Sequence, residues 1–213
     1  GFSISTYTGN STGSAAFGHG LNKAPELVII KPRNVADNWV VWYKNSVRML
    51  LHDTRADIGN QPISTSSTLI TTPSSVDNAW NGSYNYIAYC WHSVDGYSKV
   101  GSYTGNGAEG SAGQFDGTFV YTGFKPAYLL VRSHTTVSDW YVFDAKRNAF
   151  NLVDTFLKAN TTAADDTEAT SGYEIQLDFL SNGFKWKGPA GSSNYNGRDY
   201  IYIAFAETPF KYS

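Results

Sequence analysis

Four short sequence patterns occur twice in this chain, in the same order, and this repetition constrains the fold more than any other feature. The tetrapeptide Tyr-Thr-Gly-Asn is found at residues 7–10 and again at 103–106. In each copy a proline, an apolar run and a cation follow, then an aromatic run, then a Tyr-Ile-Ala segment. Because ordered self-similarity is the sequence signature of repeated structural units, we predict a duplicated fold with halves of about 1–95 and 96–213. The paired anchors begin at Tyr7 and Tyr103, Pro25 and Pro126, Trp39 and Trp140, and Tyr86 and Tyr202.

The repeated segments have the composition of β-strands. Residues 27–30 and 128–131 are short, continuous apolar runs, which are typical of strands buried on both faces. In residues 39–43 successive side chains are expected to point to opposite faces of a sheet. The Ser-Asn-Gly sequence at 181–183 lies between two apolar runs and predicts a hairpin, because Asn and Gly accept positive φ.

Helix signals are scarce. Apolar side chains at helical spacing occur at 151–158, so we expect at most one short helix, near these residues. The Gly- and Ser-rich stretch 105–117 is predicted to be a loop, and no Pro-rich or charged linker separates the halves. The prediction is an all-β, β-sandwich-like (lectin-like) fold in which residues 1–213 form a single compact domain made of two repeats.

Low charge narrows the range of partners. Only 16% of residues are charged and the formal net charge is -2. Without a basic stripe we expect no binding to nucleic acid. No apolar run approaches the ~20 residues of a spanning helix, so no membrane insertion is expected. The single cysteine, Cys90, lies in an apolar run and is predicted to be a buried, unreactive thiol. The chain begins at Gly1, not at Met, and we expect it to derive from a longer or processed chain.

No pattern of catalytic or metal-binding residues is visible. The four histidines are widely spaced and do not match metal-ligand spacing. The acidic residues Asp165, Asp166 and Glu168 lack the alternating ligands and turn glycine of a calcium loop. We therefore predict no catalytic residues, no metal and no cofactor, and a protein that is not an enzyme. A polysaccharide depolymerase stays a minor alternative, because the paired carboxylates of such enzymes are defined in space.

Two loops have the composition of a carbohydrate site. Residues 78–85 and 192–199 each precede a Tyr-Ile-Ala segment and combine aromatic with amide side chains. Aromatic rings suit the apolar C–H faces of sugars, and amides suit their hydroxyl groups. We predict exposed ring platforms at Trp80, Tyr84 and Tyr195; the alternative is that these rings anchor loops or contact other subunits. The candidate ligand-binding residues are Trp80, Tyr84, Asn85, Asn194, Tyr195 and Arg198.

The Tyr-Thr-Gly-Asn segments are interpreted as strand-to-turn markers. Gly and Asn tolerate positive φ, which suits a turn after a strand tyrosine. The alternative interpretation is a pair of ligand sites.

Longer stretches at 1–10, 24–31, 119–126, 178–185 and 202–207 carry a family resemblance that covers nearly the whole chain. They resemble a domain that recurs in structural proteins of marine tailed bacteriophages. The resemblance implies a virion structural protein, in a tail fibre or appendage more than on the capsid surface, and it supplies no established binding or catalytic residues.

From this resemblance we expect a tail-fibre or appendage domain that mediates adhesion to a host-surface glycan or protein. A homo-oligomer, with a trimer favoured, and other virion proteins are the expected partners. The alternative is a capsid decoration or architectural fibre module without receptor binding.

Overall fold

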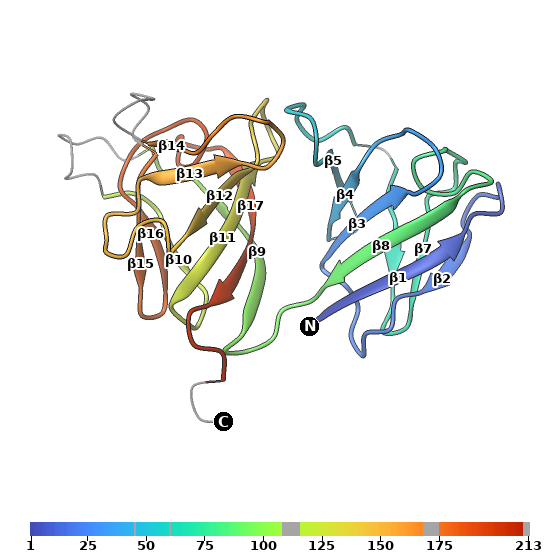
Figure 1. The fold of residues 1–213 in the computed structure, drawn as a ribbon, viewed down its shortest axis with the longest axis horizontal. Helices are drawn as coiled ribbons and strands as arrows, with labels where there is room; N and C mark the ends of the chain where they lie inside the picture. The colour runs from blue at the N-terminus through green and yellow to red at the C-terminus, as the bar shows by residue number, and fades with distance from the viewer. Residues whose placement is uncertain (45, 60, 108–115, 168–174, 211–213) are drawn as a thin grey trace. The chain divides into compact units, whose positions relative to one another are not determined.

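The computed structural model describes residues 1–44, 46–59, 61–107, 116–167 and 175–210 (Figure 1). Within these residues the chain forms antiparallel β-sheets and no helix, so the all-β, sandwich-like class is confirmed. The chain divides into two compact units, Gly1–Ser93 (unit 1) and Val94–Ser213 (unit 2). Each unit has its own hydrophobic core. The expected packing of both repeats into a single domain stays a prediction.

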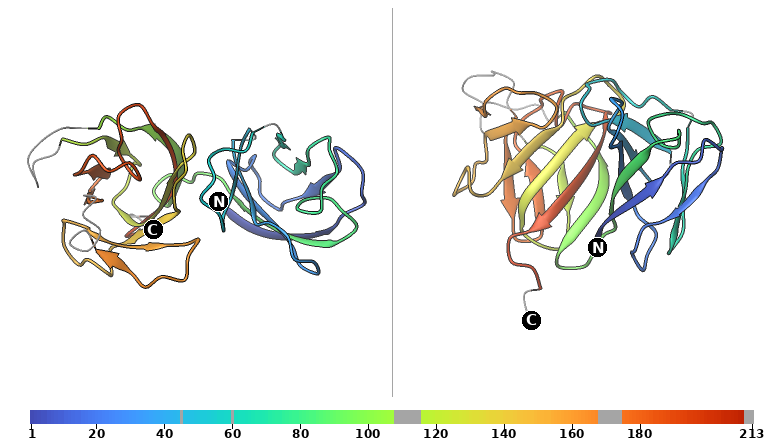
Figure 2. Two further views of the ribbon diagram at one scale, coloured as in Figure 1. Left: turned by 90° about the horizontal axis from the view of Figure 1, so that it is seen from above. Right: turned by 45° about the vertical axis from the view of Figure 1, so that its right-hand side comes forward.

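Unit 1 consists of two sheets around one core (Figure 2). The larger sheet has the strand order β1-β8-β3-β4-β5, and the smaller has the order β2-β7-β6. Trp42 from the larger sheet and Ile70 from the smaller one are both fully buried in this core. The strands are β1 (Phe2–Thr8), β2 (Ala16–Gly18), β3 (Leu27–Pro32), β4 (Val40–Tyr43), β5 (Val47–Leu50), β6 (Ser64–Thr65), β7 (Leu69–Thr71) and β8 (Asn85–Trp91).

Unit 2 repeats this plan. Its larger sheet has the order β14-β13-β12-β11-β17-β9, and its smaller sheet the order β10-β16-β15. Phe143 and Trp186, one from each sheet, pack edge to face with ring centroids 5.6 Å apart. The strands are β9 (Ser98–Thr104), β10 (Phe119–Tyr121), β11 (Pro126–Ser133), β12 (Tyr141–Asp144), β13 (Thr155–Lys158), β14 (Asp166–Thr167), β15 (Leu177–Leu180), β16 (Gly183–Trp186) and β17 (Asp199–Ala206).

The two units share one topology. Strands β1, β8, β3, β4 and β5 correspond to β9, β17, β11, β12 and β13, and β2, β7 and β6 correspond to β10, β16 and β15. The sequence repeat is therefore a structural repeat, with β14 added at the sheet edge of unit 2.

The last of the four predicted anchors is out of register. Tyr7 lies opposite Tyr86, and Tyr103 lies opposite Tyr200, so the structural counterpart of Tyr86 is Tyr200 and not Tyr202. A shift of two residues leaves every side chain on the same face of its sheet, so the alternation of the sequence does not reveal it.

Because of the register shift, the pair of residues that face each other across the first two strands differs in size between the two units. In unit 1 Ser5 lies opposite Ala88, whereas at the same place in unit 2 Gly101 lies opposite Tyr202. A Cβ added to Gly101 would lie 2.6 Å from the Tyr202 ring. The larger side chain on β17 thus requires a glycine on β9.

The helix considered at 151–158 is not present. Thr155–Lys158 forms strand β13, which pairs with β12 and places Phe156 in the core of unit 2. A few apolar residues in a short segment fit either periodicity, and sheet pairing decides the outcome here.

Other predictions from the sequence are confirmed. Strand β3 is buried on both faces, and β15 and β16 form the expected hairpin around Ser181 and Asn182. Cys90 is buried, and burial raises the pKa of its thiol to about 12. The thiol is therefore protonated and unreactive at neutral pH.

The pairing of Gly101 with Tyr202 can be tested by rebuilding the pair of unit 1. Gly101→Ser should destabilise unit 2 by about 1–3 kcal/mol through overpacking, and Tyr202→Ala by about 3 kcal/mol through loss of a buried ring. The double variant should be about 1–2 kcal/mol more stable than the sum of the single effects predicts. Urea unfolding measures these differences, with Ser102→Ala at the exposed neighbour as the control. Additive single effects would contradict the assigned register.

Candidate functional site

The first Tyr-Thr-Gly-Asn segment ends β1 and is bound to the loop that precedes β8. Asn10 makes two hydrogen bonds to the side-chain amide of Asn81. The backbone N–H of Asn10 donates to Asn81 Oδ1 (3.2 Å), and Asn81 Nδ2 donates to Asn10 Oδ1 (2.9 Å). Tyr7 Oη donates to the carbonyl of Trp80 (2.5 Å). At Gly9 an added Cβ would lie 2.0 Å from a carbonyl oxygen of the loop, so only glycine fits.

The second segment makes the same contacts in unit 2. Tyr103 Oη donates to the carbonyl of Ser193 (2.6 Å). Asn106 N–H donates to Asn194 Oδ1 (3.3 Å), and Asn194 Nδ2 donates to Asn106 Oδ1 (3.0 Å). An added Cβ at Gly105 would again lie close to a loop carbonyl, at 2.4 Å. We call this arrangement, in either unit, the amide bridge.

The interpretation of Tyr-Thr-Gly-Asn as a strand end is confirmed, because β1 ends at Thr8 and β9 at Thr104. The physical reason for the glycine differs from the predicted one. Gly9 and Gly105 are not among the positive-φ residues; positive φ occurs instead at Ser11 and Gly107. The glycines are required for the close approach of the loop.

In each unit a buried tyrosine, Tyr86 or Tyr200, stacks on the tyrosine that precedes the amide bridge. Tyr7 stacks on Tyr86 with ring centroids 4.9 Å apart, and Tyr103 stacks on Tyr200 at 5.0 Å. Burial raises the pKa of Tyr86 and of Tyr200 to about 12. Their hydroxyl groups therefore stay protonated at neutral pH and continue to donate to loop carbonyls.

The structure places Trp80 inside unit 1. Its side chain is only 3% exposed, packs edge to face on Trp42 at 5.9 Å and donates from Nε1 to the carbonyl of Ser75 (3.1 Å). The guanidinium of Arg48 lies 5.4 Å from its ring centroid. The prediction of an exposed ring platform is wrong for Trp80, which anchors the loop.

The neighbouring candidates in unit 1 differ in exposure. Tyr84 is half-buried and packs against the core of unit 1. Asn85 is exposed at the start of β8, and its Oδ1 accepts a hydrogen bond from Thr8 Oγ1 (3.1 Å). Neither residue is brought next to an exposed aromatic face by the contacts described.

In unit 2 the three candidate residues also differ in exposure. Asn194 is fully buried and is the centre of the amide bridge, so its role is structural. Tyr195 is 51% exposed, and the guanidinium of Arg198 lies 4.1 Å from its ring centroid. Arg198 Nη1 also donates to the carbonyl of Gly191 (3.0 Å). Tyr195 N–H donates to Tyr200 Oη (3.0 Å), which fixes the backbone beneath the ring. We call this pair of an exposed tyrosine and a half-buried arginine the Tyr195–Arg198 platform.

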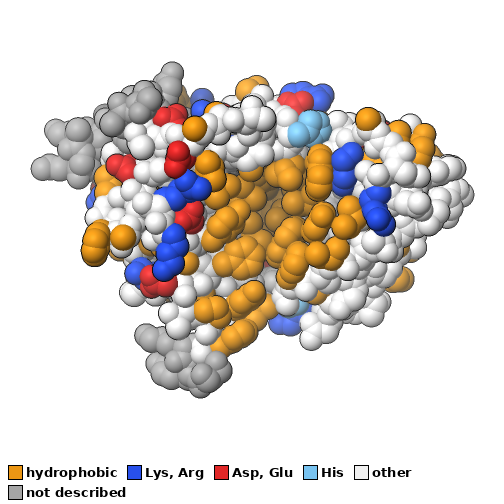
Figure 3. Space-filling model, viewed as in Figure 1, with side chains coloured by type: hydrophobic (Ala, Val, Ile, Leu, Met, Phe, Trp, Pro, Cys, Tyr) orange, Lys and Arg blue, Asp and Glu red, His pale blue; other side chains and the backbone are white. Residues whose placement is uncertain are grey.

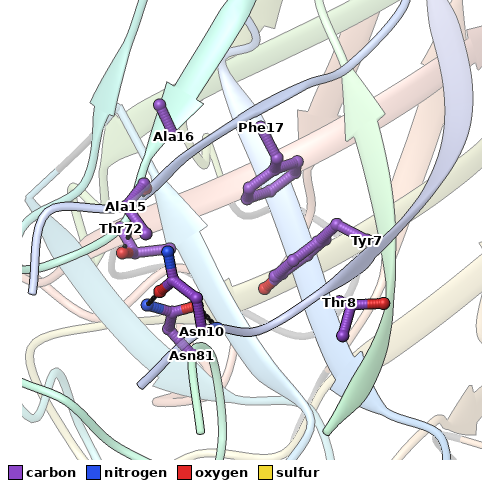
Figure 4. Close-up of a pocket in the computed structure, with 8 residues that line it drawn as sticks. All are labelled: Tyr7, Thr8, Asn10, Ala15, Ala16, Phe17, Thr72 and Asn81. Carbon is purple, nitrogen blue, oxygen red and sulfur yellow. Dashed lines mark hydrogen bonds between the residues drawn. The ribbon is translucent and has the colours of Figure 1, made fainter. Parts of the chain in front are cut away.

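Beside the first amide bridge is a small cavity of about 100 Å³, which we call the Tyr7 cavity (Figure 4). The rings of Phe17 and Tyr7 stack on one side of it, with centroids 3.9 Å apart, and the Asn10 and Asn81 amides lie on the other. None of the lining residues is charged. They are Tyr7, Thr8, Asn10, Ala15, Ala16, Phe17, Thr72 and Asn81.

Sequence reasoning missed the Tyr7 cavity. Its walls include Ala15, Phe17 and Thr72, whose types carry no functional signal by themselves. Ala15 and Thr72 become distinctive only when β2 and β7 of unit 1 are aligned with β10 and β16 of unit 2.

The part of the chain that the structure describes offers no candidate metal site. Within it no group of three or more His, Cys, Asp and Glu side chains could hold a metal ion. The same residues include no helix that is long and apolar enough to cross a membrane. A larger hollow of about 360 Å³ in unit 2 is bordered by the ion pair of Lys125 with Glu207 (3.0 Å).

Comparison with known families gives one match across both units. Residues 1–209 match the family described as a domain of unknown function (DUF7483), and the chain belongs to this family. Neither the curated proteins nor the solved structures include a match.

The amide bridge should contribute to stability. Asn194→Ala removes the donors to Asn106 Oδ1 and to the buried Gly188 carbonyl, so we expect a loss of about 2–3 kcal/mol. Asn196→Ala, in the exposed part of the same loop, is the control and should change little. Equal urea midpoints for the two variants would rule out a stabilising role for the bridge.

The buried tyrosines predict a loss of stability at alkaline pH. The pKa values of Tyr86 and Tyr200 are about 12 in the folded chain and about 10 when unfolded. Only the unfolded chain then loses these protons between the two values, so stability is full below pH ~10 and falls as pH rises toward ~12. Urea midpoints measured across this range should decrease less steeply in a Tyr86→Phe, Tyr200→Phe double variant. An equal decrease would assign the pH dependence to other groups.

Proposed function

We propose that this chain is an adhesion domain of a bacteriophage tail fibre or appendage, and that it binds a host-surface glycan through the Tyr195–Arg198 platform. The observation that carries the proposal is an exposed tyrosine ring with a guanidinium held 4.1 Å from its centroid, on a loop fixed from below. The resemblance of the sequence to phage structural proteins supports the virion location.

The platform offers both kinds of contact that a saccharide needs. The exposed part of the Tyr195 ring can pack against the C–H groups of a sugar. The Arg198 guanidinium keeps donors beyond the Nη1 bond to Gly191 and can donate to hydroxyl or carboxylate oxygens. Because the amide bridge and Tyr200 already order the loop, little conformational entropy is lost on binding.

A single platform of this size would bind weakly. Assembly into a homotrimer, together with other virion proteins, would present several platforms to one cell surface and raise the avidity without new contacts. We therefore include a trimeric appendage without enzymatic activity in the proposal.

A second candidate function is an architectural fibre or capsid-decoration module. It is favoured by the outer face of the β1-β8 strand pair, where Phe2 is 46% and Ile4 56% exposed and Phe2 stacks on Trp91 at 4.9 Å. In Figure 3 hydrophobic side chains are exposed on the viewed face of unit 1. An exposed apolar face of this kind is typical of subunit contacts.

The adhesion proposal predicts a specific loss of binding. On an array of bacterial surface glycans, Tyr195→Ala and Arg198→Ala should each weaken the wild-type signal by about tenfold or more, because each removes half of the platform. Tyr121→Ala removes a more exposed ring (65%) elsewhere in unit 2 and is the matched control.

Two results would contradict the adhesion proposal. One is the absence of any wild-type signal on the array, and the other is an equal loss for Tyr121→Ala. If, in addition, Ile4→Glu lowers the mass found by analytical ultracentrifugation, the architectural function is supported instead.

A further inference from the structure

The side chains that line the Tyr7 cavity differ from those at the matching positions of unit 2, although the matching backbone hydrogen bonds are the same. Thr72 N–H donates to the Ala15 carbonyl (2.8 Å) in unit 1, and Trp186 N–H donates to the Thr118 carbonyl (3.1 Å) in unit 2. These matching bonds align Ala15 with Thr118 and Thr72 with Trp186. At these two positions unit 1 has the smaller side chain, whereas at the neighbouring wall position it has the larger one, Phe17 in place of Val120.

In unit 2 both of these larger side chains make close contacts within the unit. Trp186 is fully buried, and its ring centroid lies 6.2 Å from that of Tyr103. Thr118 Oγ1 donates to the Thr104 carbonyl (3.1 Å) and accepts from Asn106 N–H (3.1 Å). The wall of the Tyr7 cavity thus includes two positions, Ala15 and Thr72, at which unit 1 has smaller side chains than unit 2.

One amide donor at the cavity is both oriented and available. Asn10 Oδ1 accepts from Thr12 N–H (3.1 Å), Thr12 Oγ1 (2.7 Å) and Asn81 Nδ2 (2.9 Å), which fixes which way the amide faces. Within the described residues Asn10 Nδ2 has no hydrogen-bond acceptor, and in Figure 4 it points toward Thr72. It can therefore donate to a carbonyl oxygen of a ligand.

Acceptors for a ligand N–H group are also present. Thr72 Oγ1 donates to the Ala15 carbonyl (3.2 Å), and Tyr7 Oη donates to the Trp80 carbonyl (2.5 Å). Each of these oxygens keeps a lone pair that can accept. The cavity thus offers one donor and neutral acceptors, without a charged group.

Size and apolar surface narrow the ligand further. A cavity of about 100 Å³ is smaller than a cavity of about 150 Å³ that holds one benzene ring, so it suits a group of about four non-hydrogen atoms. The Phe17 ring and the methyl group of Ala15 form its apolar wall, whereas the Ala16 side chain is exposed. A whole sugar ring does not fit, but a substituent with a methyl group, a carbonyl and an N–H does.

We propose that the Tyr7 cavity binds the acetamido group of an N-acetylated sugar. The carbonyl accepts from Asn10 Nδ2, the N–H donates to Thr72 Oγ1 or Tyr7 Oη, and the methyl group packs between Ala15 and Phe17. This inference deepens the proposed adhesion function and rests on it for the source of the sugar, a host-surface glycan. The binding itself does not depend on the Tyr195–Arg198 platform.

The test is an NMR titration of the full chain with N-acetylglucosamine, and with glucose as the probe that lacks the acetamido group. We expect N-acetylglucosamine to shift the backbone amide signals of Ala15, Ala16 and Thr72, with a Kd on the order of 1 mM. Glucose should leave these signals unchanged.

Two variants and a control locate the contact. Ala15→Thr installs the residue that unit 2 has at this place, and Asn10→Asp keeps the acceptor oxygen but removes the donor; each should weaken binding by about tenfold or more. Thr6→Ala, on the exposed face of β1, is the control and should bind as the wild type does. Well-dispersed spectra of both cavity variants show that the loss is not unfolding.

The outcomes separate this inference from the adhesion proposal. Tyr195→Ala should keep the N-acetylglucosamine shifts even where it loses glycan-array binding. The inference is overturned if the wild type shows no shifts at the cavity, if glucose gives equal shifts, or if Ala15→Thr and Asn10→Asp bind as well as the wild type.

Discussion

The amide bridge is the interaction on which the rest of each unit depends. In both copies an asparagine at the end of the first sheet strand pairs with a buried asparagine of a distant loop, Asn10 with Asn81 and Asn106 with Asn194. An unpaired amide in that position would cost free energy, so the loop and the strand end are fixed together. The exposed residues of the loop are presented from this fixed base.

The duplicated scaffold then supports two unlike surfaces. In unit 1 Ala15 and Thr72 line the Tyr7 cavity beside the bridge, whereas in unit 2 the buried Trp186 stands at the position of Thr72. Unit 2 has instead the exposed Tyr195–Arg198 platform, whose counterpart loop in unit 1 turns its Trp80 inward. A shared bridge thus allows the side chains around it to diverge without loss of the fold.

The sequence was sufficient for the all-β class, the duplication and most of the repeated strands, but not for β13, where a helix was considered, because a short apolar segment fits either periodicity. It was not sufficient for the register of β17, since a shift of two residues preserves every face. The sequence also did not show which aromatic side chains are exposed. Trp80 and Tyr195 occur in loops of similar composition, but Trp80 is 3% exposed and Tyr195 is 51% exposed. The cavity was missed because its walls include small side chains, whose effect appears only when they are compared with larger counterparts.

The mismatch in size between Ser5–Ala88 and Gly101–Tyr202 has a consequence for folding. A chain with two related halves risks exchange, in which β1 of one half pairs with β17 of the other. Such a pairing would set Ser5 against the Tyr202 ring, where only glycine fits, and the reciprocal pairing would leave a void beside Gly101. The different sizes therefore disfavour strand swapping, within one chain and between neighbouring chains of an assembly.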